Sequence, residues 1–245
     1  MQQGQSNPPR RSRFFAIMTA LLLIFVFAGF ARTLYLRVFF DVPAIPGYLY
    51  VHGIVLTAWF LLLFTQTCLI AKNRVKVHQR LGMAGVALAV CVVAISVWVL
   101  VRRDFPTIDE RPDRSFGNLI SLIVFSLCVG SAVWLRKKSA AHKRLMLIGS
   151  MIITAPALDR MSRLPGLSGF IDAILPDALG PPEIAFATLA TLSLFLIVMI
   201  YDILTRKRPH WATIGGASCL FVFGPAISAA ITMTGAWSAF VRWVG

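Results

Sequence analysis

Residues 14–36 read FFAIMTALLLIFVFAGFARTLYL, a run in which Arg32 is the one charged residue. A helix that crosses the hydrocarbon core of a bilayer needs about 20 mostly apolar residues, whereas the apolar region of a secretory signal has only about 7–15. This run therefore predicts a retained membrane-spanning segment. Because lipid offers no hydrogen-bond partner to the backbone, such a segment must be helical.

Six further runs of similar length and apolarity follow the first. They cover residues 49–71, 81–101, 117–135, 145–164, 184–204 and 212–233. The chain of 245 residues is 58% hydrophobic and only 14% charged, which excludes an ordinary soluble domain. We therefore expect an all-α fold, a polytopic transmembrane helix bundle of about seven spans. Residues 1–13 form a basic tail, residues 14–245 form a single domain, and a short surface helix is expected at 169–179.

Basic residues fall mainly on one side of this layout. Fifteen of the 24 Lys and Arg residues lie in the N-terminal tail and in the loops after the second, fourth and sixth runs. Nine of the ten acidic residues, all except Asp202, lie on the opposite side. Because cytoplasmic loops are enriched in Lys and Arg, we expect the N-terminus in the cytoplasm and the C-terminus outside, in a multi-pass protein of a bacterial inner (cytoplasmic) membrane.

The net charge of +14 bears on the expected partners. The basic residues stand in short gaps between apolar runs and not on an aqueous surface, so nucleic acid is not an expected partner. The expected partners are the lipid bilayer and its anionic headgroups at the cytoplasmic face, which attract Lys and Arg beside a span.

One motif occurs twice in the chain. Residues 78–85 and 142–149 both follow the pattern H-x-R-L-x-x-x-G, and each stands where a basic loop ends and a span opens. The motif predicts a parallel repeat of residues 49–103 and 117–164, two hairpins with the same orientation.

At these motifs the sequence resembles a family of uncharacterised bacterial multi-spanning inner-membrane proteins. The resemblance rests on H-G-x-x-x-T-A-W at 52–59, H-x-R-L-G at 78–82, H-K-R-L-M at 142–146 and A-W-x-x-F at 236–240. It runs over most of residues 50–243 and implies a multi-spanning membrane protein, with no activity or catalytic residue to transfer. In layout alone, the sequence is also distantly similar to small haem b membrane proteins that have histidines at span ends.

Polar residues at membrane depth are costly, and each is a functional candidate. His52 and Gln66 lie on one face of the second span, and Asp159 and Arg160 interrupt the fifth run just after Pro156, which is expected to bend that helix. One interpretation is a permease or small-ligand binder with an outer polar pocket formed by these four polar residues. The alternative is that His52 and Gln66 only bond to neighbouring helices and that the charged pair only ends a helix.

A second functional hypothesis concerns His78 and His142, which share the cytoplasmic side. If they face each other across the bundle, they could be the two axial ligands of haem b, with Arg80 and Arg144 beside the propionates. The protein would then be a small haem b membrane electron carrier. The alternative is that each histidine contacts lipid phosphate or a loop carbonyl.

The remaining sequence offers no catalytic centre. The H-E-x-x-H, G-x-S-x-G, Walker A and G-x-G-x-x-G motifs do not occur, and the four cysteines show no metal-ligand spacing. His210, in the basic loop after the sixth run, is expected to be solvated. The leading interpretation is an integral inner-membrane protein that is not an enzyme, with no catalytic residue, no metal and, apart from the haem alternative, no cofactor.

Overall fold

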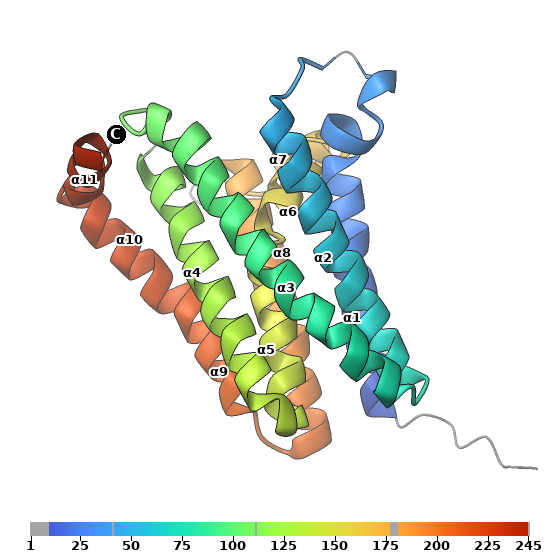
Figure 1. Cartoon of the computed structure of the whole chain (residues 1–245). Helices are drawn as coiled ribbons and strands as arrows, with labels where there is room; N and C mark the ends of the chain where they lie inside the picture. Colours follow the sequence, from blue (N-terminus) through green and yellow to red (C-terminus); the bar gives the residue numbers. More distant parts are fainter. Residues whose placement is uncertain (1–9, 41, 111, 177–180, 245) are drawn as a thin grey trace, which may run out of the picture.

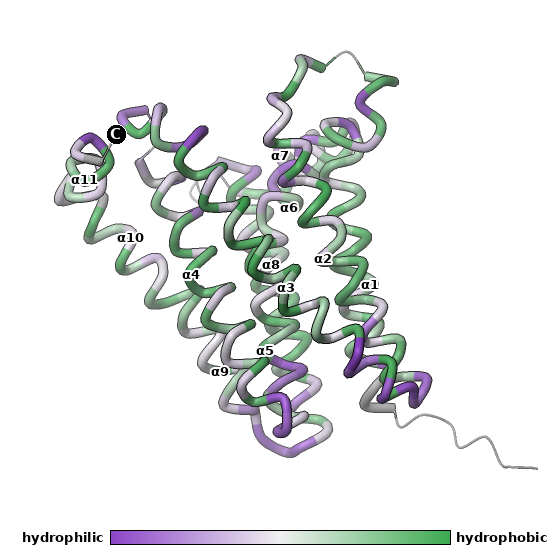
Figure 2. Tube along the Cα trace, in the orientation of Figure 1, coloured by the Kyte–Doolittle hydropathy of each residue, from purple (hydrophilic) through white to green (hydrophobic). Residues whose placement is uncertain are grey.

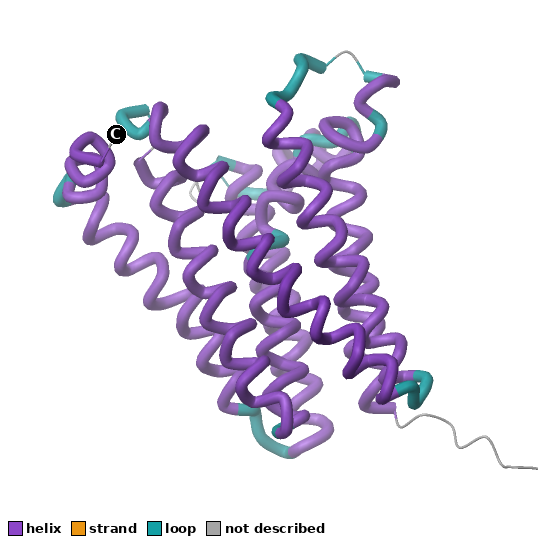
Figure 3. The backbone as a smooth tube through the Cα atoms, viewed as in Figure 1, coloured by secondary structure: helices purple, strands orange, loops and turns teal. Residues whose placement is uncertain are grey.

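The chain folds into a bundle of helices. The computed structural model describes residues 10–40, 42–110, 112–176 and 181–244, and these ranges contain helices and short connections but no strand (Figure 3). The expected all-α fold is therefore confirmed for this part of the chain. The long helices run side by side, and the short helices α7 and α11 lie at one end of the bundle (Figure 1).

The α-helices of the described residues are α1 (Arg10–Phe30), α2 (Gly47–Ala71), α3 (Val75–Val99), α4 (Pro112–Trp134), α5 (Ser139–Ile152), α6 (Ala155–Ser162), α7 (Leu167–Ile174), α8 (Pro182–Arg206), α9 (Trp211–Ser218), α10 (Gly224–Met233) and α11 (Ala236–Val244). Five-residue π-helical segments extend α1 and α3, at Ala31–Tyr35 and Leu100–Asp104. A third such segment, Cys219–Phe223, joins α9 to α10.

Six helical segments of the described residues are long and apolar enough to cross a membrane: Arg13–Tyr35, Gly47–Ala71, Val75–Thr107, Arg114–Lys137, Pro182–Arg206 and Trp211–Ile231. The pair α5 and α6 passes the same test as one span with a bend of 42°. The protein thus has six candidate spans, or seven if the bent pair is one. The bend lies just before Pro156, which has no backbone N–H to continue the helix, so the predicted bend in this segment is confirmed.

The connections between the helices gather at two ends. One of them, which we call the basic end, holds the start of α1 and the α2–α3, α4–α5 and α8–α9 connections; the other, the far end, holds α7 and α11 (Figure 1). Hydrophilic residues concentrate near the ends, and hydrophobic ones dominate between them (Figure 2). Even the outward-facing side chains of the middle are apolar: Ile24, Val90 and Leu127 are 61%, 65% and 62% exposed. This exterior is consistent with an integral membrane protein, since so much exposed apolar surface does not suit water.

The main core lies between α1, α2, α4, α5 and α8. Trp59 of α2 is almost fully buried, with its ring 5.3 Å from the ring of Phe125 on α4, and its indole N–H donates to Ser150 Oγ on α5 (3.1 Å). Leu22 of α1 and Phe195 of α8 are buried in the same cluster. The face of α2 that carries Trp59 therefore points into the protein.

The two H-x-R-L-x-x-x-G motifs have similar surroundings. Both lie within their helices, because α3 and α5 begin before the histidine and not at the leucine. A Cβ added to Gly85 would lie 3.2 Å from Leu62 of α2, and one added to Gly149 would lie 3.0 Å from Cys128 of α4. Each glycine therefore allows its helix to approach the preceding one closely. That the two hairpins superpose stays a prediction.

Two short helices at the far end differ from the sequence-based layout. α7 begins two residues before the expected surface helix and ends at Ile174, and the predicted residues 177–179 lie outside the described residues. α11 was not predicted. It buries Trp237 and Val241 against Ile108 and Phe116, in a second small core.

Candidate functional site

His78 and His142 lie next to each other at the basic end. Each stands in the first turn of its helix, α3 for His78 and α5 for His142, and their ring centroids are 6.4 Å apart with the ring planes at 84°. Ring atoms lie about 1 Å from a centroid, so the two imidazoles do not bond directly to each other. The structure therefore brings together the two histidines of the repeated motif, and leaves a gap between their rings.

Each of these rings is held at its Nδ1 atom. His142 Nδ1 donates to the carbonyl of Ala132 on α4, at 2.8 Å. For His78 the neighbour is Gln66, whose side-chain nitrogen donates to His78 Nδ1 (2.5 Å) while its oxygen accepts from the N–H of Gly82 (2.9 Å). Both bonds orient their rings, but they set opposite tautomers: the His142 ring keeps its lone pair at Nε2, whereas the His78 ring carries its proton there.

An apolar cavity of about 430 Å³ lies between α3 and α4, and neither His78 nor His142 lines it. Its walls are mostly Val, Ala and Gly, from Val86 to Ala94 on α3 and from Phe125 to Val133 on α4. Val133 directly follows Ala132, whose carbonyl holds His142. At about 1.5 Å per helical residue, the cavity begins about 12 Å along α3 from His78. The cavity is thus separate from the histidine pair.

Basic residues stand close to the two histidines in the chain. Lys76 and Arg80 on α3 are exposed. Lys143 is partly buried, with its ammonium group 4.6 Å from the centre of the Phe15 ring. Arg144 is not available as the second propionate partner that the sequence suggested, because it is buried and bonded to Asp202.

The structure divides the proposed outer pocket between the two ends of the bundle. Gln66 bonds to His78 at the basic end, about 21 Å along α2 from His52 at 1.5 Å per residue. Sharing a helix face did not place the two residues at the same depth. Gln66 therefore belongs with the histidine pair and not with the far-end residues.

The other residues of that pocket lie at the far end. Asp159 forms ion pairs with Arg163 (2.9 Å) and Arg114 (3.8 Å). Arg160 donates to the carbonyl of Pro156 (3.0 Å) and lies over the ring of Phe30. Within the described residues, buried His52 Nδ1 has no hydrogen-bond partner. A direct coupling of His52 to Asp159 stays a prediction.

A buried ion pair at the basic end was not predicted. Asp202 of α8 is 0% exposed and accepts from Arg144 of α5 through Nε (2.9 Å) and Nη2, from the Thr213 hydroxyl (2.8 Å) and from the backbone N–H of His210 (3.2 Å). These bonds join α5, α8 and α9. The available signal was that Asp202 is the one acidic residue that the sequence places on the basic side.

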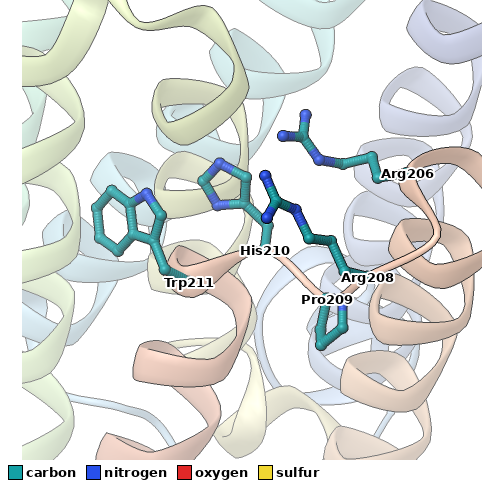
Figure 4. Close-up of a pocket in the computed structure, with 5 residues that line it drawn as sticks. All are labelled: Arg206, Arg208, Pro209, His210 and Trp211. Atoms are coloured by element: carbon teal, nitrogen blue, oxygen red, sulfur yellow. The ribbon is translucent and has the colours of Figure 1, made fainter.

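His210 is not solvated as expected, since it is only 8% exposed. Its Nδ1 accepts from the N–H of Ala212 and so caps α9 (3.1 Å). Burial lowers the pKa of His210, and the charges of Arg144 and Arg206 lower it further, against the opposing effect of Asp202. The loop around it lines a separate pocket (Figure 4). The expectation failed because this loop folds back onto the ends of α5 and α8.

Comparison of the chain with protein-family models, with curated proteins and with solved structures found no match. Its possible chemistry therefore rests on the geometry of its own side chains. Over the described residues no group of three or more His, Cys, Asp or Glu side chains could hold a metal ion. A metal at the histidine pair would thus take two protein ligands from this part of the chain.

Proposed function

We propose that this integral membrane protein carries electrons on one haem b, with His78 and His142 as the axial ligands. The observation that carries the proposal is the 6.4 Å between the two ring centroids. Two imidazoles bound to opposite faces of one metal atom through nitrogen–metal bonds of about 2 Å have their centroids about 6 Å apart. The spacing of the rings thus suits one shared metal.

The number of ligands favours haem over a bare metal ion. Two imidazoles leave a zinc ion two short of its usual four protein ligands, whereas the porphyrin of haem supplies four nitrogens and needs two axial partners. Exposed Lys76 and Arg80, two residues from His78 on either side, offer partners for propionates. When bound, haem b supplies a one-electron redox couple.

Neighbouring residues would orient the two histidine ligands. Because the Ala132 carbonyl accepts from His142 Nδ1, the lone pair of that ring is at Nε2, the nitrogen that can bind a metal. At His78 the Gln66 nitrogen donates to Nδ1, so the proton of the neutral ring is at Nε2, and His78 would have to release one of these two nitrogens before it binds a metal. Gln66 is thus a positioning residue, and its bond to His78 would tune the basicity of that ligand.

The experiment is a reduced-minus-oxidised absorption spectrum of the purified protein after titration with haem. We expect Soret and α bands of a six-coordinate b-type haem, loss of this spectrum in both His78→Ala and His142→Ala, and an unchanged spectrum in His52→Ala. A Gln66→Leu variant should keep the haem but shift its midpoint potential. A wild-type protein that stays colourless, or a spectrum that survives either histidine variant, would falsify the proposal.

The proposed orientation in the membrane rests on the distribution of charge. The basic end carries the Lys- and Arg-rich connections, which favours a cytoplasmic position for it in a bacterial inner membrane, with the far end outside. The proposed haem would then lie near the cytoplasmic surface and could exchange electrons with a partner on that side.

A second candidate function is supported by the unsatisfied Nδ1 atom of His52. A buried polar atom without a partner costs free energy unless a ligand or water satisfies it, and Arg160 and Asp159 supply charges at the same end of the bundle. We therefore keep a far-end site for a small polar ligand as the alternative. The absorption spectrum separates the two, because this site requires no haem and a colourless protein leaves it standing.

A further inference from the structure

The loop between α8 and α9 forms a cationic pocket at the basic end. Arg206, Arg208, Pro209, His210 and Trp211 line a cavity of about 400 Å³. Lys207, with a φ of 62°, adopts the left-handed conformation and ends α8, so the chain turns sharply between the two arginines. Figure 4 shows their guanidinium groups on one side of the loop, beside the His210 ring.

His210 contributes a fixed hydrogen-bond donor to this pocket. The ring is 8% exposed, and its Nδ1 accepts from the N–H of Ala212 (3.1 Å). A neutral imidazole that accepts at Nδ1 carries its proton at Nε2. The lowered pKa of His210, caused by burial and by the nearby arginines, keeps this neutral form. Over the described residues Nε2 has no hydrogen-bond partner of its own, so its N–H is left for a ligand.

Neither arginine of the pocket is in an ion pair within the described residues, so both guanidinium groups can bind a ligand. Asp202, the acid nearest in the chain, is occupied by Arg144, Thr213 and the His210 backbone. The ion pairs of the described residues include neither Arg206 nor Arg208. The pocket therefore has two guanidinium groups and one neutral N–H donor, and no carboxylate lines it. Such a set of donors matches the oxygens of a phosphate group.

The depth of the pocket indicates where the phosphate comes from. Trp211 lines it and is 58% exposed, and Leu204, one turn from the loop, is 70% exposed. Exposed apolar side chains beside the charged loop place it where the hydrocarbon region meets water, and tryptophan is enriched at that boundary. A lipid headgroup reaches this level, and its glycerol and first acyl carbons can lie against the Trp211 ring.

We propose that this pocket binds the phosphate group of one anionic phospholipid headgroup. Arg206 and Arg208 pair with the phosphate oxygens, the His210 Nε2–H donates to one of them, and Trp211 packs against the lipid stem. The site is specific because its donors come from a folded loop anchored by Asp202, and it differs from the diffuse attraction that every exposed Lys and Arg exerts on an anionic surface.

The experiment is native mass spectrometry of the full-length protein in detergent, with phosphatidylglycerol or phosphatidylcholine added. The test variant is Arg206→Gln/Arg208→Gln. Its matched control is Arg136→Gln/Lys137→Gln, which removes the same charge from exposed residues of another connection at the same end. We expect the wild type to retain one phosphatidylglycerol, the test variant to reduce its retention at least about tenfold, and the control to retain it.

Further measurements distinguish the alternatives. His210→Asn keeps a helix cap but withdraws the Nε2–H donor, and it should weaken phosphatidylglycerol retention without changing phosphatidylcholine retention. Equal losses in the test and control variants would mean diffuse surface attraction and would overturn the proposal, as would equal retention of both lipids by the wild type. If millimolar inorganic phosphate displaces the lipid but glycerol phosphate does not, the pocket binds free phosphate and the lipid is not its ligand.

Discussion

Replacing Asp202 by alanine tests the buried ion pair at the basic end. The carboxylate is 0% exposed and is the acceptor for Arg144, which is 2% exposed, and for Thr213 and the backbone of His210. Without it, the guanidinium stays buried with one remaining bond, from Nη1 to the carbonyl of Ala140 (2.7 Å). The variant thus leaves a charge and two donors without their acceptor.

The magnitude follows from these losses. Removing one partner of a buried ion pair costs about 3–5 kcal/mol because the other charge stays uncompensated. The Thr213 hydroxyl and the His210 N–H each add a cost of about 1–3 kcal/mol if nothing replaces their acceptor. Water that enters from the nearby basic end reduces these penalties, so we expect Asp202→Ala to lower the free energy of unfolding by about 4 kcal/mol. Replacing both partners, as in Arg144→Met/Asp202→Leu, should recover most of this loss.

The assay is reversible unfolding in mixed micelles, with the free energy of unfolding compared between variants. The matched control is Asp159→Ala at the far end, where the partner Arg163 is 56% exposed, and an exposed pair contributes only about 0–1 kcal/mol. The reasoning is refuted if Asp202→Ala costs no more than the control. It is also refuted if the double replacement is as unstable as Asp202→Ala, since the charge left behind would then not be the cause.

Three further predictions concern packing, pH and topology. An added Cβ at Gly29 lies 2.1 Å from a backbone oxygen of α6, so Gly29→Ala should lower the free energy of unfolding by about 3 kcal/mol through overpacking. Gly130→Ala is the control: its added Cβ meets nothing within 4 Å, so it should be neutral or stabilising in the same mixed-micelle unfolding assay. Because the pKa of His210 is lowered in the folded state, its contribution to stability is complete above the unfolded value of about 6.5 and is lost as the pH falls through the lower folded pKa. His210→Asn should therefore make the free energy of unfolding less dependent on pH in this range. An unchanged pH dependence would contradict the assignment. Alkaline phosphatase fused after Gly245 should be active and fused within residues 136–144 inactive, and the reverse pattern would show that the orientation is inverted.

Part of the candidate site could be predicted from the sequence. The repeated motif drew attention to His78 and His142 on the same side of the bundle, and the structure brings their rings to 6.4 Å. Pro156 was expected to bend its helix, and the bend of 42° is there. Both predictions concern properties that a short stretch of chain carries by itself: a motif at a fixed place in a helix, and a missing backbone donor.

The assignments that failed concern depth and tertiary contact. Gln66 shares a helix face with His52, but face periodicity says nothing of which neighbouring side chain meets a residue, and Gln66 bonds to His78 instead. His210 was expected in solvent because its loop is basic, yet the loop folds onto α5 and α8 and buries the ring. The sequence contains no local signal for either contact, because each depends on how helices distant in the chain lie against one another.

By itself, the sequence determined the helical class, the six or seven apolar spans and the basic side of the chain. These properties are local, since a run of about 20 apolar residues must satisfy its own backbone hydrogen bonds as a helix. Only the tertiary structure decided that Arg144 pairs with Asp202, that α11 forms a second core with Ile108 and Phe116, and that Arg206, Arg208 and His210 share one pocket. The rotation, tilt and depth of each helix come from packing against the others, and every one of these contacts joins residues on different helices or across a turn.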